Sequence, residues 1–142
     1  MSMAVSQLSV FVENKTGRVA EVMRFVADKG LKVIGFTIAD TTDYGIVRLV
    51  VDRSPEARDA LRDHGFTVIA SDVLCVETGE RGSALAALVE VLSDHMVNVE
   101  YMYLTTREAA VVKVEEGEKA EKLLSESGFR VLSQKDLADS GS

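Results

Sequence analysis

The chain carries the same pattern twice, and this repeat constrains its fold more than any other feature. Residues 8–38 recur at 74–104 with a shift of 66, and residues 52–68 recur at 115–131 with a shift of 63. Both copies end in Gly-Phe-x-Val, at Gly65 and at Gly128. Two copies of about 65 residues predict two small domains, because solenoids are built from three or more repeats.

Within the first copy, the spacing of apolar residues predicts an alternation of strands and helices. Leu8, Val10 and Val12 alternate as in a strand with one buried face. The apolar residues at 19, 22, 23 and 26 have the spacing of a helix with one apolar stripe, and Gly30 is placed to end that helix. The remaining predicted elements are strands over 31–39 and 46–51, a helix over 54–64, and a strand over 66–70.

Each copy therefore has the order βαββαβ. Because such crossover connections are right-handed, both helices should cover the same face of a four-stranded antiparallel sheet. The predicted fold is α+β, with two tandem ferredoxin-like domains over residues 1–70 and 71–135. Residues 136–142 have the polar, small-residue composition of a flexible tail.

The charge distribution excludes several classes of partner. Residues 1–71 carry nine basic and nine acidic side chains, whereas residues 72–142 carry seven and fourteen, so the net charge of −7 lies in the second half. Without a basic stripe, neither a nucleic acid nor an anionic membrane is an expected partner. The chain also has no apolar run long enough to span a bilayer, and we expect it to be cytoplasmic.

No catalytic or metal-binding signature is present in the sequence. Cys75 is the single cysteine and lies within a predicted strand, where an inert thiol is expected. His64 and His95 lie 31 residues apart at the ends of predicted helices, which is not the spacing of metal ligands. We therefore expect no enzyme activity, no cofactor and no metal.

The loop before the first helix, Glu13-Asn-Lys-Thr-Gly-Arg-Val, is the most distinctive polar segment. Gly17 permits a close approach to the backbone, and the free N–H groups of the first helical turn form a site for a carboxylate or a phosphate. Asn14 offers a donor and an acceptor, and Asp40 is placed to accept an ammonium group. These groups suit a free amino acid, although a plain helix cap and turn would have the same pattern.

The two copies, over about residues 6–133, resemble the ACT domain family, in particular small proteins made of two ACT domains. The family loop Asn-x-Pro-Gly-x-Leu appears at residues 14–19, with Thr16 at the proline position. In the second copy, Gly82 and Ser83 stand at the proline and glycine positions. The resemblance implies amino-acid binding that regulates amino-acid metabolism, with the site in the first copy. Together with Asp40, the predicted ligand-binding residues are Asn14, Lys15, Thr16, Gly17, Arg18 and Val19.

Self-association is a further expectation from the sequence. The strand at 46–51 is apolar on its inward face and largely apolar on the other, where Arg48 is the exception, and Phe11 lies opposite the inward residues of the first strand. Such surfaces are typical of subunit contacts, and a homodimer is the simplest closed form. Three readings of function compete. The first is a sensor that binds an amino acid and acts through assembly or a regulated enzyme, and the second is a protein-interaction or structural module with a vestigial site. The third, an enzyme on a ferredoxin-like fold, is disfavoured because the sequence shows no acid–base pair and no metal-binding set.

Overall fold

The computed structural model describes residues 3–41, 43–79 and 81–139. The chain divides into two compact units, one formed by Ser6–Ser71 and the other by the described parts of residues 1–5 and 72–142. The predicted domain ranges of 1–70 and 71–135 stay a prediction. The compact units differ from them at the N-terminus, since residues 1–5 group with the second half of the chain.

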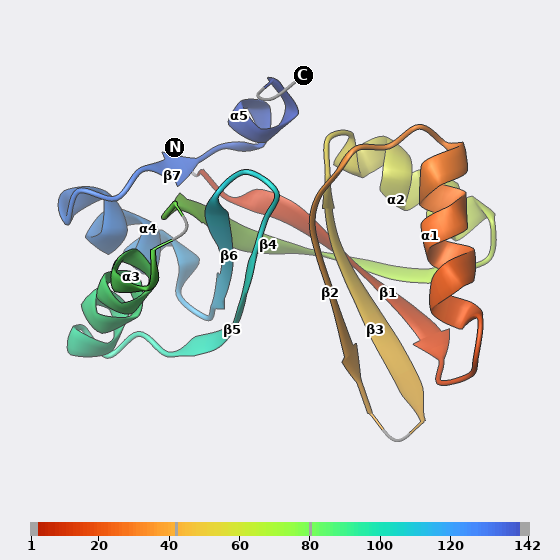
Figure 1. The fold of residues 1–142 in the computed structure, drawn as a ribbon, viewed down its shortest axis with the longest axis horizontal. Coiled ribbons are helices and arrows are strands. Elements are labelled where there is room, and N and C mark those ends of the chain that lie inside the picture. The colour runs from red at the N-terminus through yellow and green to blue at the C-terminus, as the bar shows by residue number, and fades with distance from the viewer. Residues whose placement is uncertain (1–2, 42, 80, 140–142) are drawn as a thin grey trace. The chain divides into compact units, whose positions relative to one another are not determined.

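The first unit has the predicted element order (Figure 1). It contains β1 (Val5–Glu13), α1 (Arg18–Asp28), β2 (Val33–Asp40), β3 (Tyr44–Val51), α2 (Ser54–Asp63) and the beginning of β4 (Thr67–Glu77). The strand order is β2-β3-β1-β4, and β3 is antiparallel to both β1 and β2. The non-sequential order arises because each helix carries the chain across the sheet, as in the predicted ferredoxin-like topology.

One core lies between this sheet and its two helices. Leu8 and Val10 pair with Leu49 and Val47 across β1 and β3, so all four side chains share a face. The apolar stripes of both helices pack on that face, and their residues in the buried cluster are Val22, Val26, Ala57 and Leu61. The buried faces that were predicted for the strands and for the helices thus meet in one core, which confirms the predicted fold.

The second unit repeats this arrangement. The end of β4 is followed by α3 (Gly82–Asp94), β5 (Val99–Leu104), β6 (Ala109–Val114), α4 (Gly117–Glu126) and β7 (Val131–Leu132). The strand order β7-β4-β6-β5 corresponds to that of the first unit. Residues Leu88, Leu92, Ala120 and Leu124 of the two helices lie in a second buried cluster with β4 and β6.

Residues at both chain ends pack in the second unit. Met3 packs against the second core, and its backbone N–H donates to Glu121 Oε1 at 2.7 Å. Near the other end, Gln134–Asp139 form helix α5, with Leu137 fully buried. Ser133 and Asp136 cap this helix reciprocally, since each backbone N–H donates to the other's side chain at 2.8 and 3.1 Å.

This helix differs from the predicted tail over residues 136–142. The tail prediction rested on small polar residues and missed the single buried leucine that anchors the segment. Residues 140–142 lie outside the described part of the chain.

Candidate functional site

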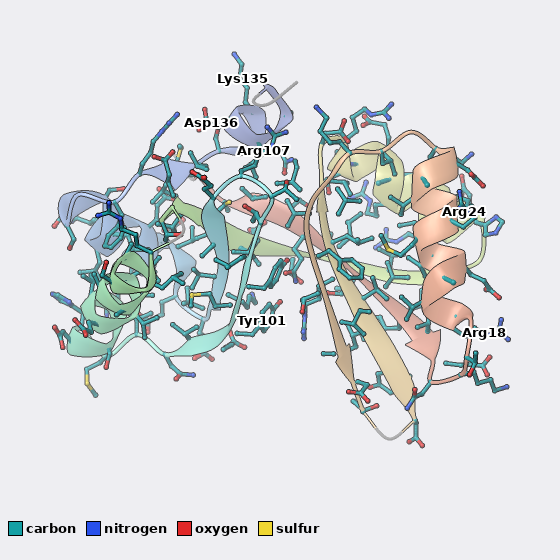
Figure 2. All side chains as sticks on the ribbon, in the orientation of Figure 1. Arg18, Arg24, Tyr101, Arg107, Lys135 and Asp136 are labelled. Carbon is teal, nitrogen blue, oxygen red and sulfur yellow. The ribbon has the colours of Figure 1, made fainter. Side chains whose placement is uncertain are left out.

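The predicted site is the loop that joins β1 to α1. Asn14, Lys15, Thr16 and Gly17 are exposed, and the loop is closed by short backbone hydrogen bonds. The Lys15 N–H donates to the Glu13 carbonyl at 2.8 Å, and the Arg18 N–H donates to the Lys15 carbonyl at 3.2 Å. Figure 2 shows Arg18 at the end of α1 that adjoins this loop. The loop is thus a compact turn at the end of an interior strand of the sheet.

Gly17 is the N-cap of α1 and adopts a left-handed backbone with φ of 91°. This conformation favours glycine because it brings a Cβ atom against the backbone. A Cβ placed on Gly17 would meet no heavy atom within 4 Å, so the space above this residue is open. A ligand can therefore approach the backbone here without displacing a side chain.

The beginning of α1 retains unsatisfied donors. No side chain caps the helix, and the first i→i−4 hydrogen bond of α1 is the one from the Glu21 N–H to the Gly17 carbonyl, at 3.1 Å. Within the described residues, the N–H groups of Gly17, Val19 and Ala20 have no acceptor. Such donors, together with the positive end of the helix dipole, favour an anion.

The charged side chains of the loop occur as opposite pairs. Lys15 Nζ lies 2.8 Å from Glu13 Oε2, and the Arg18 guanidinium is paired with Glu21. The hydrogen bond and charge of Lys15 hold the pKa of the Glu13 carboxyl below its usual range. With two charges of each sign, the loop has no net charge, which suits a ligand that carries one charge of each sign.

Asp40 lies at the same end of the sheet but two strands from the loop. Its register partner is Gly45 on β3, which in turn pairs with Val12 on β1. Neighbouring strands are about 4.8 Å apart, so Asp40 and β1 are separated by about 10 Å. The Asn14 N–H donates to the Asp43 carbonyl in the β2–β3 turn at 3.4 Å, so the β1–α1 loop contacts this turn.

These distances divide the seven predicted residues into two groups. The structure brings Asn14, Lys15, Thr16, Gly17, Arg18 and Val19 together in one turn, with Val19 half-buried against the core. Asp40 is exposed. It lies too far from the loop to contact the ligand atoms that contact Gly17, and it is placed to contact the opposite end of a ligand. The ligand-binding role of all seven stays a prediction.

The equivalent loop of the second unit has a different structure. The N–H groups of Thr78 and Gly79 donate to the Glu108 carbonyl at 3.1 and 2.8 Å. The N-cap of α3 is Arg81, in an extended conformation, where α1 has a left-handed glycine. Residue 80 lies outside the described residues. Two amides of this loop, those of Thr78 and Gly79, are thus already used within the unit.

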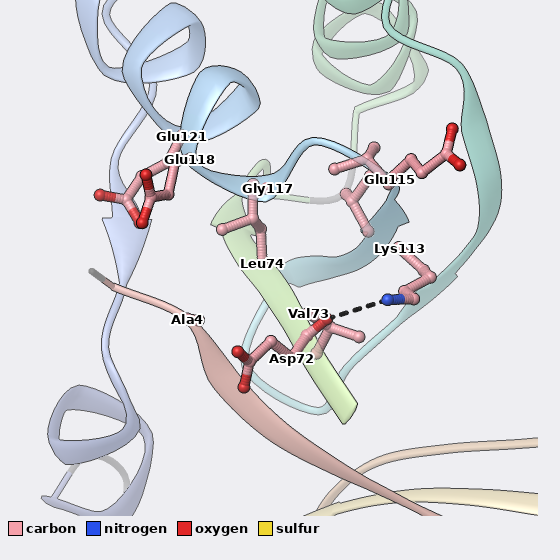
Figure 3. A pocket seen from close by; sticks show the side chains of 11 residues that line it. Ala4, Asp72, Val73, Leu74, Lys113, Glu115, Gly117, Glu118 and Glu121 are labelled. Carbon is pink, nitrogen blue, oxygen red and sulfur yellow. Dashed lines mark hydrogen bonds between the residues drawn. The ribbon is translucent and has the colours of Figure 1, made fainter. Parts of the chain in front are cut away.

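A cavity of about 220 Å³ in the second unit was not predicted from the sequence (Figure 3). It lies between the beginning of α4 and the adjoining part of β4, and Lys113 Nζ donates to the Asp72 carbonyl at 3.4 Å. The other charged residues that line it are Asp72, Glu115, Glu118 and Glu121. This excess of carboxylates would repel the carboxylate of an amino acid.

The repeat contains the signal that could have located this cavity. Gly117 occupies the position of Ser54 in the first copy. There, the buried Ser54 hydroxyl is hydrogen-bonded to the Ser6 hydroxyl at 2.9 Å, so the side chain occupies the corresponding place. Gly117 has no side chain, and a Cβ placed on it would meet no heavy atom within 4 Å.

The single thiol is unsuited to nucleophilic chemistry. Cys75 is fully buried in β4, and burial raises its pKa to about 12. It is therefore protonated at neutral pH, whereas a nucleophile needs the thiolate. Among the described residues, no group of three or more His, Cys, Asp or Glu side chains is arranged to hold a metal ion.

Comparison with known proteins assigns the repeat to a family. The family described as the ACT domain pair matches residues 3–140. A comparison with curated proteins found no match. No helix in the described part of the chain is both long and apolar enough to cross a membrane.

Solved structures share the fold over nearly the whole chain. Protein BT0572 from Bacteroides thetaiotaomicron is 33% identical, with a TM-score of 0.87 over 96% of this chain and 97% of that one. The regulatory subunit of aspartate kinase from Thermus thermophilus is 17% identical, with a TM-score of 0.63 over 89% of this chain and 94% of its own. The corresponding subunit from Thermus flavus is 18% identical, with a TM-score of 0.60 and the same coverage.

Proposed function

Because the chain belongs to the ACT domain family as an ACT domain pair, we propose that it is a regulatory protein that binds a free amino acid. The observation that carries this proposal is the uncapped beginning of α1. There, Gly17 adopts a left-handed conformation under open space, beside N–H groups that have no acceptor among the described residues.

The ligand's two charged groups have different partners in this proposal. Its carboxylate accepts hydrogen bonds from the N–H groups of Gly17 and Val19, at the positive end of α1. Its ammonium group is bound by the Asn14 side-chain oxygen and by backbone carbonyls of the turn. Asp40, about 10 Å from β1, contacts the polar or positively charged side chain of a longer ligand.

The protein acts on metabolism without catalysis of its own. Regulatory subunits of aspartate kinase share its fold, and a kinase of amino-acid biosynthesis is the kind of enzyme that such a subunit controls. We propose that ligand binding changes either the assembly of this chain as a homodimer or its contact with a regulated enzyme in the cytoplasm.

In the second loop, the Thr78 and Gly79 amides are bonded to Glu108 and the N-cap of α3 is not a left-handed glycine. These features favour a second candidate, a protein-interaction or structural module with a vestigial ligand site. A thermal-shift screen of the twenty amino acids separates the two. A ligand at about 100 times its Kd stabilises the folded protein by about 2.7 kcal/mol, whereas a module without a site shows no shift with any of them.

The site itself is tested by matched glycine variants with the amino acid that the screen identifies. Gly17→Ala and Gly30→Ala both place a Cβ in open space on a left-handed backbone, with φ of 91° and 67°. Both should cost about 1 kcal/mol of stability, and only Gly17→Ala should weaken binding. Gly17→Val should abolish binding, while Ser83→Val in the second loop should leave it unchanged.

Calorimetry decides between the outcomes. Equal binding by Gly17→Val and the parent would place the site elsewhere. Weakened binding by Gly30→Ala would show that general destabilisation explains the loss.

A further inference from the structure

Strand β2 is an open edge of the sheet in the first unit. It ends the strand order, and within the described residues no strand pairs with its outer side (Figure 1). The hairpin that joins it to β3 shows which backbone groups point outward. The Thr41 N–H donates to the Tyr44 carbonyl at 2.8 Å, so the odd-numbered residues of β2 back to Gly35 bond to β3. The backbone N–H and C=O groups of Phe36 and Ile38 therefore point away from β3.

This edge has few of the features that normally prevent two edges from pairing. Phe36 and Ile38 project from the same face of β2 and are 39% and 48% exposed. Edge strands are usually protected by charged residues, prolines, bulges or short length. The segment 33–39 contains no charge and no proline, and its bulge at 33–35 precedes the exposed residues. The edge strand of the second unit, β5, is shorter and contains the exposed Glu100, so β2 is the less protected edge.

The charges at the two ends of β2 are of opposite sign. Lys29 and Lys32 precede the strand and are exposed. Asp40 and Asp43 lie at its other end and are also exposed. In an antiparallel pair, the beginning of each strand lies beside the end of the other, so two copies of β2 bring basic residues near acidic ones at both ends. Antiparallel pairing with β5 of another copy would instead bring Asp40 near a glutamate, Glu100.

We propose that β2 pairs antiparallel with β2 of a second copy, with Phe36 opposite the partner's Ile38, so that the two sheets join. Each of the two Phe36–Ile38 pairs exchanges two N–H···O hydrogen bonds through the groups that point outward. Each pair also joins an aromatic and a β-branched side chain, which is a favourable cross-strand contact. The twofold axis passes between the two copies of Thr37, and an isologous contact of this kind closes as a dimer.

The proposal specifies the contact of the homodimer proposed above and rests on that part of the proposed function. The net charge of −7 lies in the second half of the chain, whereas residues 1–71 carry nine basic and nine acidic side chains. Two copies that meet through β2 therefore join the halves that carry no net charge and do not repel one another. A second copy thus supplies the backbone groups, the apolar contacts and the charges that suit this edge.

Sedimentation velocity over about 1 to 100 µM protein tests the contact on the full chain. The parent should be a dimer, and Ile38→Lys should raise the dimer Kd at least about tenfold, because lysine on an edge strand opposes pairing. Leu104→Lys is the matched control. Leu104 has the position of Ile38 in the repeat, lies on the β5 edge and is 56% exposed, and its change should leave the Kd unaltered. Circular dichroism confirms that each variant is folded.

A disulfide tests the register. Thr37 and the partner's Thr37 would form a non-hydrogen-bonded pair with Cα atoms about 4.5 Å apart, which is within the range of a disulfide. Thr37→Cys should therefore give a linked dimer under mild oxidation, seen on a non-reducing gel. Ala39→Cys, on the same face, should not, because the two copies of residue 39 are about 14 Å apart in this register. Cys75 is fully buried and serves both variants as a common background. Failure of Thr37→Cys to link, or equal linkage of Ala39→Cys, overturns the register.

The remaining outcomes separate this proposal from the proposed function. A monomeric parent over the whole range overturns both the β2 contact and self-association. A parent dimer that Ile38→Lys leaves intact, or that Leu104→Lys weakens equally, overturns the β2 contact alone. In either case, an amino-acid thermal shift that persists in Ile38→Lys shows that the ligand site stands independently.

Discussion

Replacing Met96 with glycine should stabilise the second unit. Met96 follows α3 with φ of 62°, a left-handed conformation that L-residues disfavour, and the repeat places Gly30 at the same position after α1, with φ of 67°. The left-handed backbone costs an L-residue about 1–2 kcal/mol. Glycine removes this cost. It also lowers the free energy of unfolding by about 0.5–1 kcal/mol, because glycine gives the unfolded chain more conformational freedom.

The side chain of Met96 contributes little that would offset this gain. The side chain is 89% exposed, so almost no buried apolar contact is lost when it is removed. The expected net effect of Met96→Gly is therefore a gain of about 0.5–1 kcal/mol in the free energy of unfolding. The reverse change, Gly30→Ala, should destabilise the first unit by about 1 kcal/mol.

Native-state hydrogen exchange at low protein concentration measures both changes, because it assigns stability to each unit separately. In Met96→Gly, the slowest amides of the second unit should exchange more slowly, and those of the first unit should be unchanged. The reasoning is refuted if Met96→Gly loses stability while Gly30→Ala behaves as expected. The left-handed turn after α3 would then depend on contacts of the methionine side chain.

Two further predictions follow from buried residues. Leu137→Ala should reduce stability by about 2–5 kcal/mol in urea unfolding, because Leu137 is fully buried, whereas a true tail would tolerate the change without loss. Burial raises the pKa of Cys75 from 9.0 to about 12, so the unfolded chain ionises first as the pH rises. Stability should thus be intact below pH 9 and fall between pH 9 and 12, by about 1.4 kcal/mol per pH unit. Denaturant titrations across this range should show a smaller loss for Cys75→Ala, and an equal loss would assign the pH dependence to other groups.

The order of the elements could be predicted from the sequence because it depends on local patterns. The alternation of Leu8, Val10 and Val12 and the helical spacing after Gly17 each define a buried face within a few residues. The glycines that end the helices follow from backbone sterics alone. The repeat then supplied the topology twice, so each copy supported the interpretation of the other.

The composition of the candidate loop was predictable in the same way, but its hydrogen bonding was not. Asn14–Val19 are consecutive, so any fold would bring them together. Which N–H groups remain without an acceptor depends on the backbone angle of Gly17 and on the neighbouring β2–β3 turn. Likewise, the separation of Asp40 from β1 depends on the register of three strands.

The sequence by itself determined the twofold repeat, the βαββαβ order and the fold class, since periodicity and turn residues act over short segments. Only the tertiary structure decided that Met3 packs in the second unit, that Leu137 anchors a terminal helix, and that Gly117 lines a cavity between α4 and β4. Each of these depends on contacts between residues far apart in the chain. Such contacts depend on which surfaces are still exposed after the local elements have formed. The pattern within a single segment does not specify them.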